Sequence, residues 1–218
     1  MNVTVFEAIN ITKKYRNTLA LNQVSMSVMQ GDIYGFIGEN GAGKTTMIRL
    51  LTGLAEPTTG KIALFGESNK KLAKQRERIG CIIESPSLYL DMTAYENLEV
   101  QRLQRGIPGK GCIDNALALV GLKDTGKKKA KDFSLGMRQR LALAIALLGN
   151  PEFLVLDEPI NGLDPTGIIE LRNLLKRLNK ERGITILISS HILTELHQLA
   201  NRYGISVSYT HLRAHETR

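Results

Sequence analysis

Apolar and polar residues alternate along two stretches near the start of the chain, residues 3–11 and 19–28. Alternation with a period of two predicts strands that bury one face. The apolar run at residues 33–37 predicts a strand buried on both faces, and residues 47–51 follow with helical spacing. The chain is therefore predicted to begin with β structure and to continue through a strand, a glycine-rich loop and a helix.

The same periodicities divide the rest of the chain into short strands and helices. Strands are expected at residues 61–66, 79–84, 153–156 and 184–188, and helices at 72–78 and 168–179. Strands that alternate with helices predict an α/β fold with a mixed, largely parallel sheet as its core. We expect a single domain over residues 1–206, with an N-terminal antiparallel β part. Its core is residues 1–85 and 150–206, and an α-helical subdomain is inserted at about 86–149.

Residues 207–218 follow neither period. They resemble one translated reading frame of a sequencing adapter, so we predict a non-native tail and a native chain that stops near residue 206, in mid-domain. The alternative is a genuine C-terminal strand with a basic tail. His211 and His215 are therefore set aside in the search for functional residues.

Composition and charge narrow the class of protein. The chain has 218 residues, of which 43% are hydrophobic and 23% charged, and its formal net charge is +8. A positive net charge is typical of proteins that bind nucleic acid or a membrane surface. The densest basic run, at residues 127–131, has no interleaved aromatic residues, so we predict that the protein does not bind nucleic acid.

The sequence shows no pattern typical of a membrane-spanning segment and no pattern of cysteines typical of disulfides or metal sites. The longest fully apolar stretch, residues 141–148, falls far short of the roughly 20 residues that cross a bilayer. The chain opens in strand-like alternation without a signal peptide, so we predict a cytoplasmic protein that reaches the inner face of the membrane only through a partner. Cys81 and Cys112 form neither a disulfide framework nor a metal-ligand pattern. Cys81 lies in an apolar run and is predicted to be a buried free thiol.

The glycine-rich loop carries the strongest chemical signal. Residues 38–45 read GENGAGKT and match the phosphate-binding pattern G-x-x-x-x-G-K-[ST] at every fixed position. Its glycines let the backbone wrap a phosphate, and the helix N-terminus offers partial positive charge. Lys44 is predicted to reach the β- and γ-phosphates of ATP, and the Thr45 hydroxyl to hold Mg²⁺. The nucleotide-binding residues predicted here are Gly38, Asn40, Gly41, Gly43, Lys44, Thr45 and Thr46.

Two carboxylates end a second predicted buried strand. Asp157 and Glu158 directly follow the apolar residues 153–156. A buried unpaired charge is very costly, so acids in this position usually face a site. Asp157 is predicted to hold Mg²⁺ through water, and Glu158 to accept a proton from the attacking water as general base. Taken alone, the pattern also fits an acidic helix N-cap.

A third segment, residues 133–140, reads FSLGMRQR and opens a helix. It resembles the signature motif of ATP-binding cassette (ABC) ATPases, usually L-S-G-G-Q. Ser134 and Gly136 match this motif, whereas Leu135 and Met137 replace its first glycine and its glutamine. Ser134 and the helix N-terminus are predicted to bind the nucleotide as an anion site; the alternative is a serine that only caps a core helix. The resemblance covers residues 3 to about 205 and implies a P-loop NTPase fold of ABC type.

Three more residues match positions of the same family. Tyr15 stands where such ATPases place an aromatic ring that stacks on adenine, although a surface tyrosine is the alternative. Asp164, in the sequence GLDP, resembles the loop that crosses the dimer interface. His191 follows the strand at 184–188, in the position of the switch histidine that contacts the γ-phosphate. A lone histidine at a strand end is more often structural.

Glu84 departs from the family pattern, which usually has glutamine at this position. A glutamate keeps an oxygen for Mg²⁺, adds a charge and loses the amide donor. We therefore predict that Glu84 joins the metal site, with Mg²⁺ or Lys44 offsetting its charge. This variant, with the sequence YLDMTAYENL at 89–98, resembles the ATPases of exporters that protect bacteria against lantibiotics and bacitracin-like peptides. Drift without a special role is the alternative.

The resemblance implies an enzyme that hydrolyses ATP with Mg²⁺ as a pair of ATPase subunits, a homodimer, docked on membrane permease subunits. Residues 84–97 are expected to pass motion to the permease. We predict the ATPase subunit of an antibiotic-peptide exporter. The alternatives are an ABC exporter of drugs or lipids, a non-transport ABC protein, and a binding module without catalysis.

Overall fold

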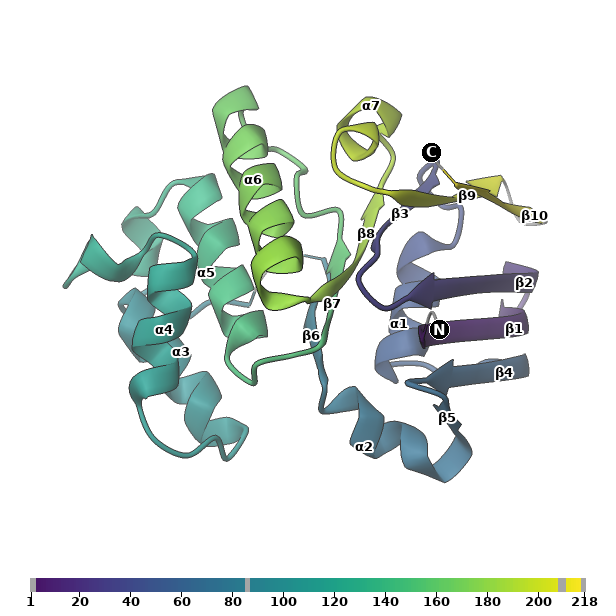
Figure 1. Cartoon of the computed structure of the whole chain (residues 1–218), viewed down its shortest axis with the longest axis horizontal. Helices are drawn as coiled ribbons and strands as arrows, with labels where there is room; N and C mark the ends of the chain where they lie inside the picture. Colours follow the sequence, from purple (N-terminus) through teal and green to yellow (C-terminus); the bar gives the residue numbers. More distant parts are fainter. Residues whose placement is uncertain (1–2, 85–86, 208–210, 217–218) are drawn as a thin grey trace.

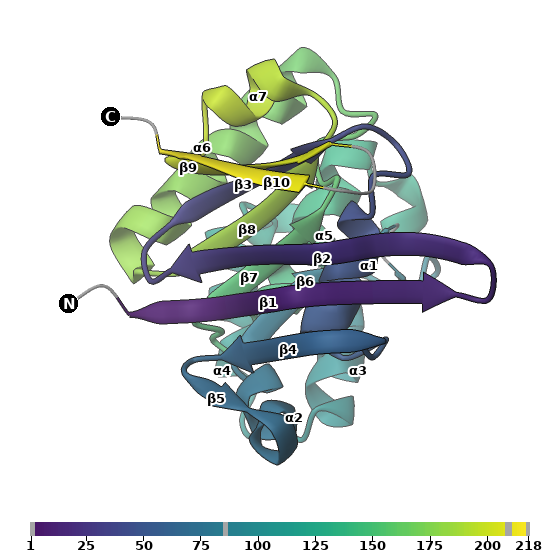
Figure 2. The same ribbon diagram turned by 90° about the vertical axis from the view of Figure 1, so that its right-hand side faces the viewer.

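An antiparallel sheet forms one side of the protein, whose computed structural model describes residues 3–84, 87–207 and 211–216. Its strands are β1 (Thr4–Tyr15), β2 (Thr18–Met29), β4 (Thr59–Leu64) and β5 (Glu67–Ser68), in the order β2-β1-β4-β5 (Figure 2). The predicted alternation is confirmed from Phe6 to Ile9, because Phe6 and Ala8 are buried while Glu7 and Ile9 are exposed. Val5 is also buried, at a place where the β1–β2 pairing is irregular.

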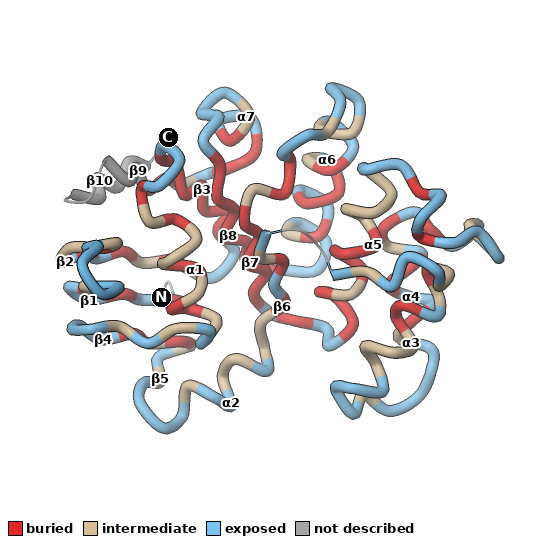
Figure 3. The backbone as a smooth tube through the Cα atoms, turned by 180° about the vertical axis from the view of Figure 1, so that it is seen from behind, coloured by how far each residue is buried: buried red, intermediate tan, exposed pale blue. Residues whose placement is uncertain are grey.

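A second sheet crosses the middle of the molecule. Its strands are β3 (Ile33–Gly38), β6 (Ile79–Ile82), β7 (Phe153–Asp157), β8 (Thr185–Ser190), β9 (Arg202–Val207) and β10 (His211–Glu216). Their order is β10-β9-β3-β8-β7-β6, and every pair except β9–β10 is parallel. The continuous apolar runs are confirmed as strands buried on both faces, since β3, β7 and β8 are buried along their whole length (Figure 3). All the parallel strands end at one edge of the sheet.

Helices connect the strands of the parallel sheet. They are α1 (Lys44–Thr52), α2 (Leu72–Arg76), α3 (Ala94–Gln104), α4 (Gly111–Leu119), α5 (Leu135–Leu147), α6 (Pro165–Arg182) and α7 (Leu193–His197), with short 3₁₀ helices at Asn69–Lys71, Lys123–Thr125 and Ala130–Asp132. Local sequence fixes several of their ends: Thr93 and Glu96 form a capping box at the start of α3, and Gly183 ends α6 in the left-handed conformation. None of the helices described here is long and apolar enough to cross a membrane.

The parallel sheet separates two apolar cores (Figure 1). Alternate residues of β7 serve different cores: Leu154 and Leu156 pack in the core with α5 and α6, whereas Phe153 and Val155 pack in the core with α1 and the antiparallel sheet. Helices α3, α4 and α5 pack on one another on the side away from α1. The architecture agrees with the predicted α/β fold, its N-terminal antiparallel part and its helical insertion.

One strand was not predicted from the sequence, and one sequence prediction is wrong. Residues 211–216 form strand β10, paired antiparallel with β9, where no regular structure was predicted. This pairing uses backbone hydrogen bonds to a sheet edge, which require no side-chain alternation; the proposed foreign origin of residues 207–218 stays a prediction. Cys81 is exposed rather than buried, because β6 is the edge strand of the parallel sheet and its face is only partly covered.

Candidate active site

The glycine-rich loop joins the end of β3 to the start of α1, at the edge where the parallel strands end. Gly41 and Gly43 have φ of 86° and 84°, which side chains rarely adopt. A Cβ at position 43 would also lie 2.6 Å from the carbonyl oxygen of Ala20, whereas one at position 41 would meet nothing within 4 Å. Gly43 is therefore required twice, for its backbone angle and for its closeness to β2.

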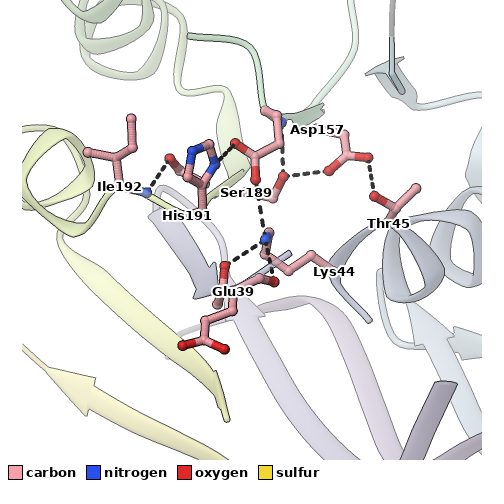
Figure 4. Close-up of polar contacts among 10 residues, drawn as sticks. Glu39, Lys44, Thr45, Asp157, Ser189, His191 and Ile192 are labelled. Atoms are coloured by element: carbon pink, nitrogen blue, oxygen red, sulfur yellow. Dashed lines mark hydrogen bonds and ion pairs between the residues drawn. The ribbon is translucent and has the colours of Figure 1, made fainter. Parts of the chain in front are cut away.

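Lys44 is buried, with a side chain only 6% exposed. Its ammonium group donates hydrogen bonds to the carbonyl oxygens of Gly38 at 2.7 Å and Glu39 at 3.1 Å (Figure 4). It also lies 3.3 Å from Oε1 of Glu158. The loop thus encloses a positive charge whose present partners are the loop itself and one carboxylate.

Asp157, at the end of β7, is held through both of its carboxylate oxygens. The Thr45 hydroxyl donates to Oδ2 at 2.8 Å, and the Ser189 hydroxyl donates to Oδ1 at 2.5 Å (Figure 4). Ser189 lies at the end of the neighbouring strand β8 and also accepts a hydrogen bond from the backbone N–H of Glu158 at 2.9 Å. These bonds join the phosphate loop, β7 and β8 in one polar cluster.

Glu158 has a left-handed backbone, with φ of 49°. A non-glycine residue in this region is strained, and such strain gathers at functional sites. Its Oε2 lies 2.9 Å from Nδ1 of His191. Its Oε1 is buried beside Lys44 and makes no hydrogen bond with the described part of the chain. The side chain of Glu158 thus points toward Lys44 of the phosphate loop, and its Oε1 remains available to accept a hydrogen bond.

These residues fit a magnesium–nucleotide complex. In proteins, Mg²⁺ binds oxygen atoms, and it commonly takes one or two carboxylates together with substrate phosphates and water rather than a cage of protein ligands. The Thr45 hydroxyl and the Asp157 carboxylate offer such oxygens at one point. No group of three or more histidine, cysteine or acidic side chains suited to a metal occurs among residues 3–84, 87–207 and 211–216.

Glu84 follows β6 at the same edge of the sheet, and its carboxylate pairs with the guanidinium of Arg49 on α1. The sequence predicted that Lys44 or Mg²⁺ would offset the charge of Glu84, but its partner in the structure is Arg49. Both side chains are largely in solvent, at 42% exposure for Arg49 and 59% for Glu84. The role of Glu84 as a metal ligand stays a prediction.

The remaining loop and hairpin residues lie around this cluster. Tyr15 ends β1 and is 41% exposed, and the ammonium of Lys13 lies 4.7 Å from the centroid of its ring. An exposed ring is available for stacking, so an adenine contact by Tyr15 remains a prediction. Asn40 is exposed and Thr46 is half-buried in the first turn of α1.

Ser134, Gly136 and Asp164 lie outside this cluster. Ser134 caps α5, its hydroxyl accepting the N–H of Met137 at 3.2 Å, and α5 lies on the far side of the parallel sheet from α1 (Figure 1). Asp164 caps α6 by accepting the N–H of Gly167 at 3.2 Å. One chain therefore does not bring the signature segment to its own phosphate loop.

Two residues, Ser189 in the cluster and Arg49 beside Glu84, had no role in the sequence reasoning. Ser189 had a visible signal, because it is the first of two serines that precede His191 at the end of an apolar strand. Arg49 had none, since an arginine on an amphipathic helix is ordinarily a solvated residue. Only the folded chain places its guanidinium against Glu84.

Comparison with known proteins agrees with this geometry. Residues 21–161 match the ABC transporter family, and the chain belongs to that family. A dimeric ATP-binding cassette, solved in a post-hydrolysis state with ADP and Pi bound, superimposes with a TM-score of 0.84 at 25% identity. That match covers 98% of this chain and 99% of the other.

Two relatives have named transport roles. The bacitracin transport ATP-binding protein BcrA of Bacillus licheniformis is 51% identical over 203 residues, which cover 93% of this chain. The chain spans 66% of that relative's length. The lantibiotic transport ATP-binding protein SrtF of Streptococcus pyogenes is 44% identical over 195 residues, covering 89% of this chain and 83% of the relative.

Proposed function

We propose that the chain is the ATP-binding and ATP-hydrolysing subunit of a transporter that exports bacitracin-like or lantibiotic peptides. One observation carries the hydrolase part: Lys44, Thr45, Asp157, Glu158 and His191 come from three separate segments and meet at one edge of the sheet. Similarity to bacitracin and lantibiotic transport proteins supports the choice of substrate.

Nucleotide binding follows from the loop and its lysine. The phosphates of ATP take over the Lys44 ammonium from the carbonyl groups of Gly38 and Glu39. Thr45 and Asp157 are the residues that hold Mg²⁺, whose charge neutralises the phosphate oxygens when it is bound. Because Asp157 is already fixed by Ser189, its carboxylate keeps its orientation while Thr45 changes partner.

Glu158 and His191 serve the attacking water. The carboxylate of Glu158 accepts the proton of that water as general base, and Oε1 is the oxygen without a hydrogen bond. Nδ1 of His191 contacts Oε2 of the same carboxylate. This contact orients Glu158 and leaves the other ring nitrogen free to meet the γ-phosphate, the switch role proposed for His191.

A second copy of the chain completes the site. Ser134 and Gly136 begin α5 with exposed backbone N–H groups at a helix N-terminus, which attracts anions. They lie away from the phosphate loop of their own chain, so we assign them to the nucleotide held by a partner copy. We assign Asp164, which caps the start of α6, to the same dimer interface.

A membrane permease is the other proposed partner. Next to Glu84, a groove of about 200 Å³ lies between the end of β6 and helices α3 and α5. Its lining combines apolar side chains, among them Ile82, Leu88 and Ala142, with the polar residues Ser87 and Gln101. We propose that this groove receives the permease, which holds the ATPase on the inner face of the cell membrane and receives motion through residues 84–97.

The test is a pair of assays on one set of variants. Purified protein with Glu158→Gln should still bind ATP and dimerise with it, but hydrolyse it at least about 100-fold more slowly, whereas Lys44→Ala should lose ATP binding. Normal turnover by Glu158→Gln would refute the assigned base. In cells that also express the neighbouring permease genes, the intact chain should raise resistance to bacitracin or a lantibiotic. Resistance only to unrelated drugs would favour a different ABC exporter.

A further inference from the structure

Glu84 and Glu158 occupy equivalent places on neighbouring strands. Ile82 of β6 pairs with Leu156 of β7, so two residues further along each strand the chain reaches Glu84 and Glu158. Both glutamates have left-handed backbones, with φ of 60° and 49°. The two glutamates therefore follow the ends of two neighbouring strands at matching positions, at the edge of the sheet where Asp157 ends β7.

The two glutamates have different partners. Glu158 lies between Lys44 and His191, inside the site. Glu84 pairs with Arg49, which lies one helical turn after Thr45 on α1. The helix that begins at the phosphate loop thus provides a cation for each glutamate, Lys44 at its first residue and Arg49 in its second turn.

We infer that Arg49 is a positioning residue for Glu84, holding its carboxylate on α1 and away from the metal-binding oxygens of Thr45 and Asp157. Glu84 can face Mg²⁺ only after it leaves Arg49. A glutamine at position 84 carries no charge and is not held in this way. The inference rests on the proposed nucleotide site and adds to it a competition between one arginine and the metal for one carboxylate.

The exposure of the pair sets the size of the effect. Ion pairs between largely solvated side chains are weak and are screened by salt. Arg49 can therefore shift the metal requirement by a few-fold, at most about fivefold, and the shift should shrink as the ionic strength rises. An ion pair as weak as this one breaks readily, so Glu84 could leave Arg49 and turn to Mg²⁺.

The experiment is a double-mutant cycle read out by nucleotide binding rather than by hydrolysis. The Mg²⁺ concentration that gives half-maximal binding of a fluorescent ATP analogue is measured for the intact chain, Arg49→Gln, Glu84→Gln and the double variant at low salt. We expect Arg49→Gln to lower that concentration about two- to fivefold when Glu84 is present, and to change it much less when residue 84 is glutamine. The same change in both backgrounds would overturn the inference, because it would be a general effect of removing a positive charge.

Arg78→Gln is the matched control. Arg78 pairs with Glu152 at 2.6 Å, with similar exposure of 37% and 56%, at the opposite ends of the same two strands. This variant should leave the Mg²⁺ requirement unchanged. Thermal unfolding without nucleotide verifies that each variant is folded. If the intact chain binds no nucleotide, the proposed function fails; if it binds and the cycle shows no coupling, only the inference about Arg49 fails.

Discussion

Replacing Ser189 with alanine removes one buried hydroxyl that holds two neighbouring groups of the site. It deprives Oδ1 of Asp157 of its donor at 2.5 Å and the N–H of Glu158 of its acceptor at 2.9 Å. Ser189 is completely buried. A buried group left without a partner costs about 1–3 kcal/mol, and hydrogen bonds to charged groups contribute about 1.5–3 kcal/mol. Since the two losses share one site and do not simply add, we expect Ser189→Ala to lower the free energy of unfolding by about 2–4 kcal/mol.

Thermal unfolding of the nucleotide-free protein measures this loss. In a domain of this size, 1 kcal/mol shifts the midpoint by about 2–4 °C, so the expected decrease is roughly 5–15 °C. Ser190→Ala is the matched control, because Ser190 is equally buried on the same strand, but among the described residues its hydroxyl accepts only the N–H of Ile192, at 3.0 Å. Its expected cost is about 1 kcal/mol. Equal destabilisation by both variants would show that the bond to Asp157 adds nothing, and that Thr45 alone holds that carboxylate.

Three further predictions follow from the same structure. Gly43→Ala should lower the free energy of unfolding, measured by chemical denaturation, by about 3 kcal/mol or more, because the new Cβ would contact the Ala20 carbonyl oxygen. Gly41→Ala should cost only the backbone strain of about 1–2 kcal/mol, because its Cβ would meet nothing within 4 Å. Equal losses in the two variants would refute the steric argument. Asp164→Ala should lower the free energy of unfolding by about 1 kcal/mol through loss of the α6 cap, and Asp164→Ser should keep the stability of the original chain because serine also caps helices. If Asp164→Ser still lowers the rate of ATP hydrolysis, Asp164 does more than cap a helix. Cys81 should react with iodoacetamide in the folded protein, because the residue is exposed. The reaction rate should keep rising above pH 9.0, because desolvation raises the pKa of the Cys81 thiol and the thiolate is the reactive form. A rate that reaches a plateau by pH 8 would contradict this pKa shift.

The strands and most helices could be predicted because their signals are local. The strands buried on both faces read as unbroken apolar runs, and α6 lies between a capping aspartate, Asp164, and a closing glycine, Gly183. The exposure of Cys81 could not be predicted, because it depends on which strand lies at the sheet edge. Strand order is a property of the whole fold, and no periodicity within one segment encodes it.

The candidate site shows the same division. Lys44, Thr45, Asp157 and Glu158 could be identified because a phosphate loop and an acidic strand end are recognisable patterns. The hydrogen bonds of Ser189 and the ion pair of Arg49 with Glu84 join segments far apart in sequence. Serine and arginine have many ordinary uses, so the sequence marks the position of Ser189 before His191 but does not show which partners Ser189 and Arg49 take in the fold.

The division of the interior into two apolar layers has an evolutionary consequence. A change of side-chain volume in a close-packed layer must be compensated by neighbours in that same layer. Leu154 and Leu156 pack in the layer with α5 and α6, whereas Phe153 and Val155 pack in the layer with α1 and the antiparallel sheet. Selection can therefore change the side chains of the helical half while the half that carries the phosphate loop stays as it is.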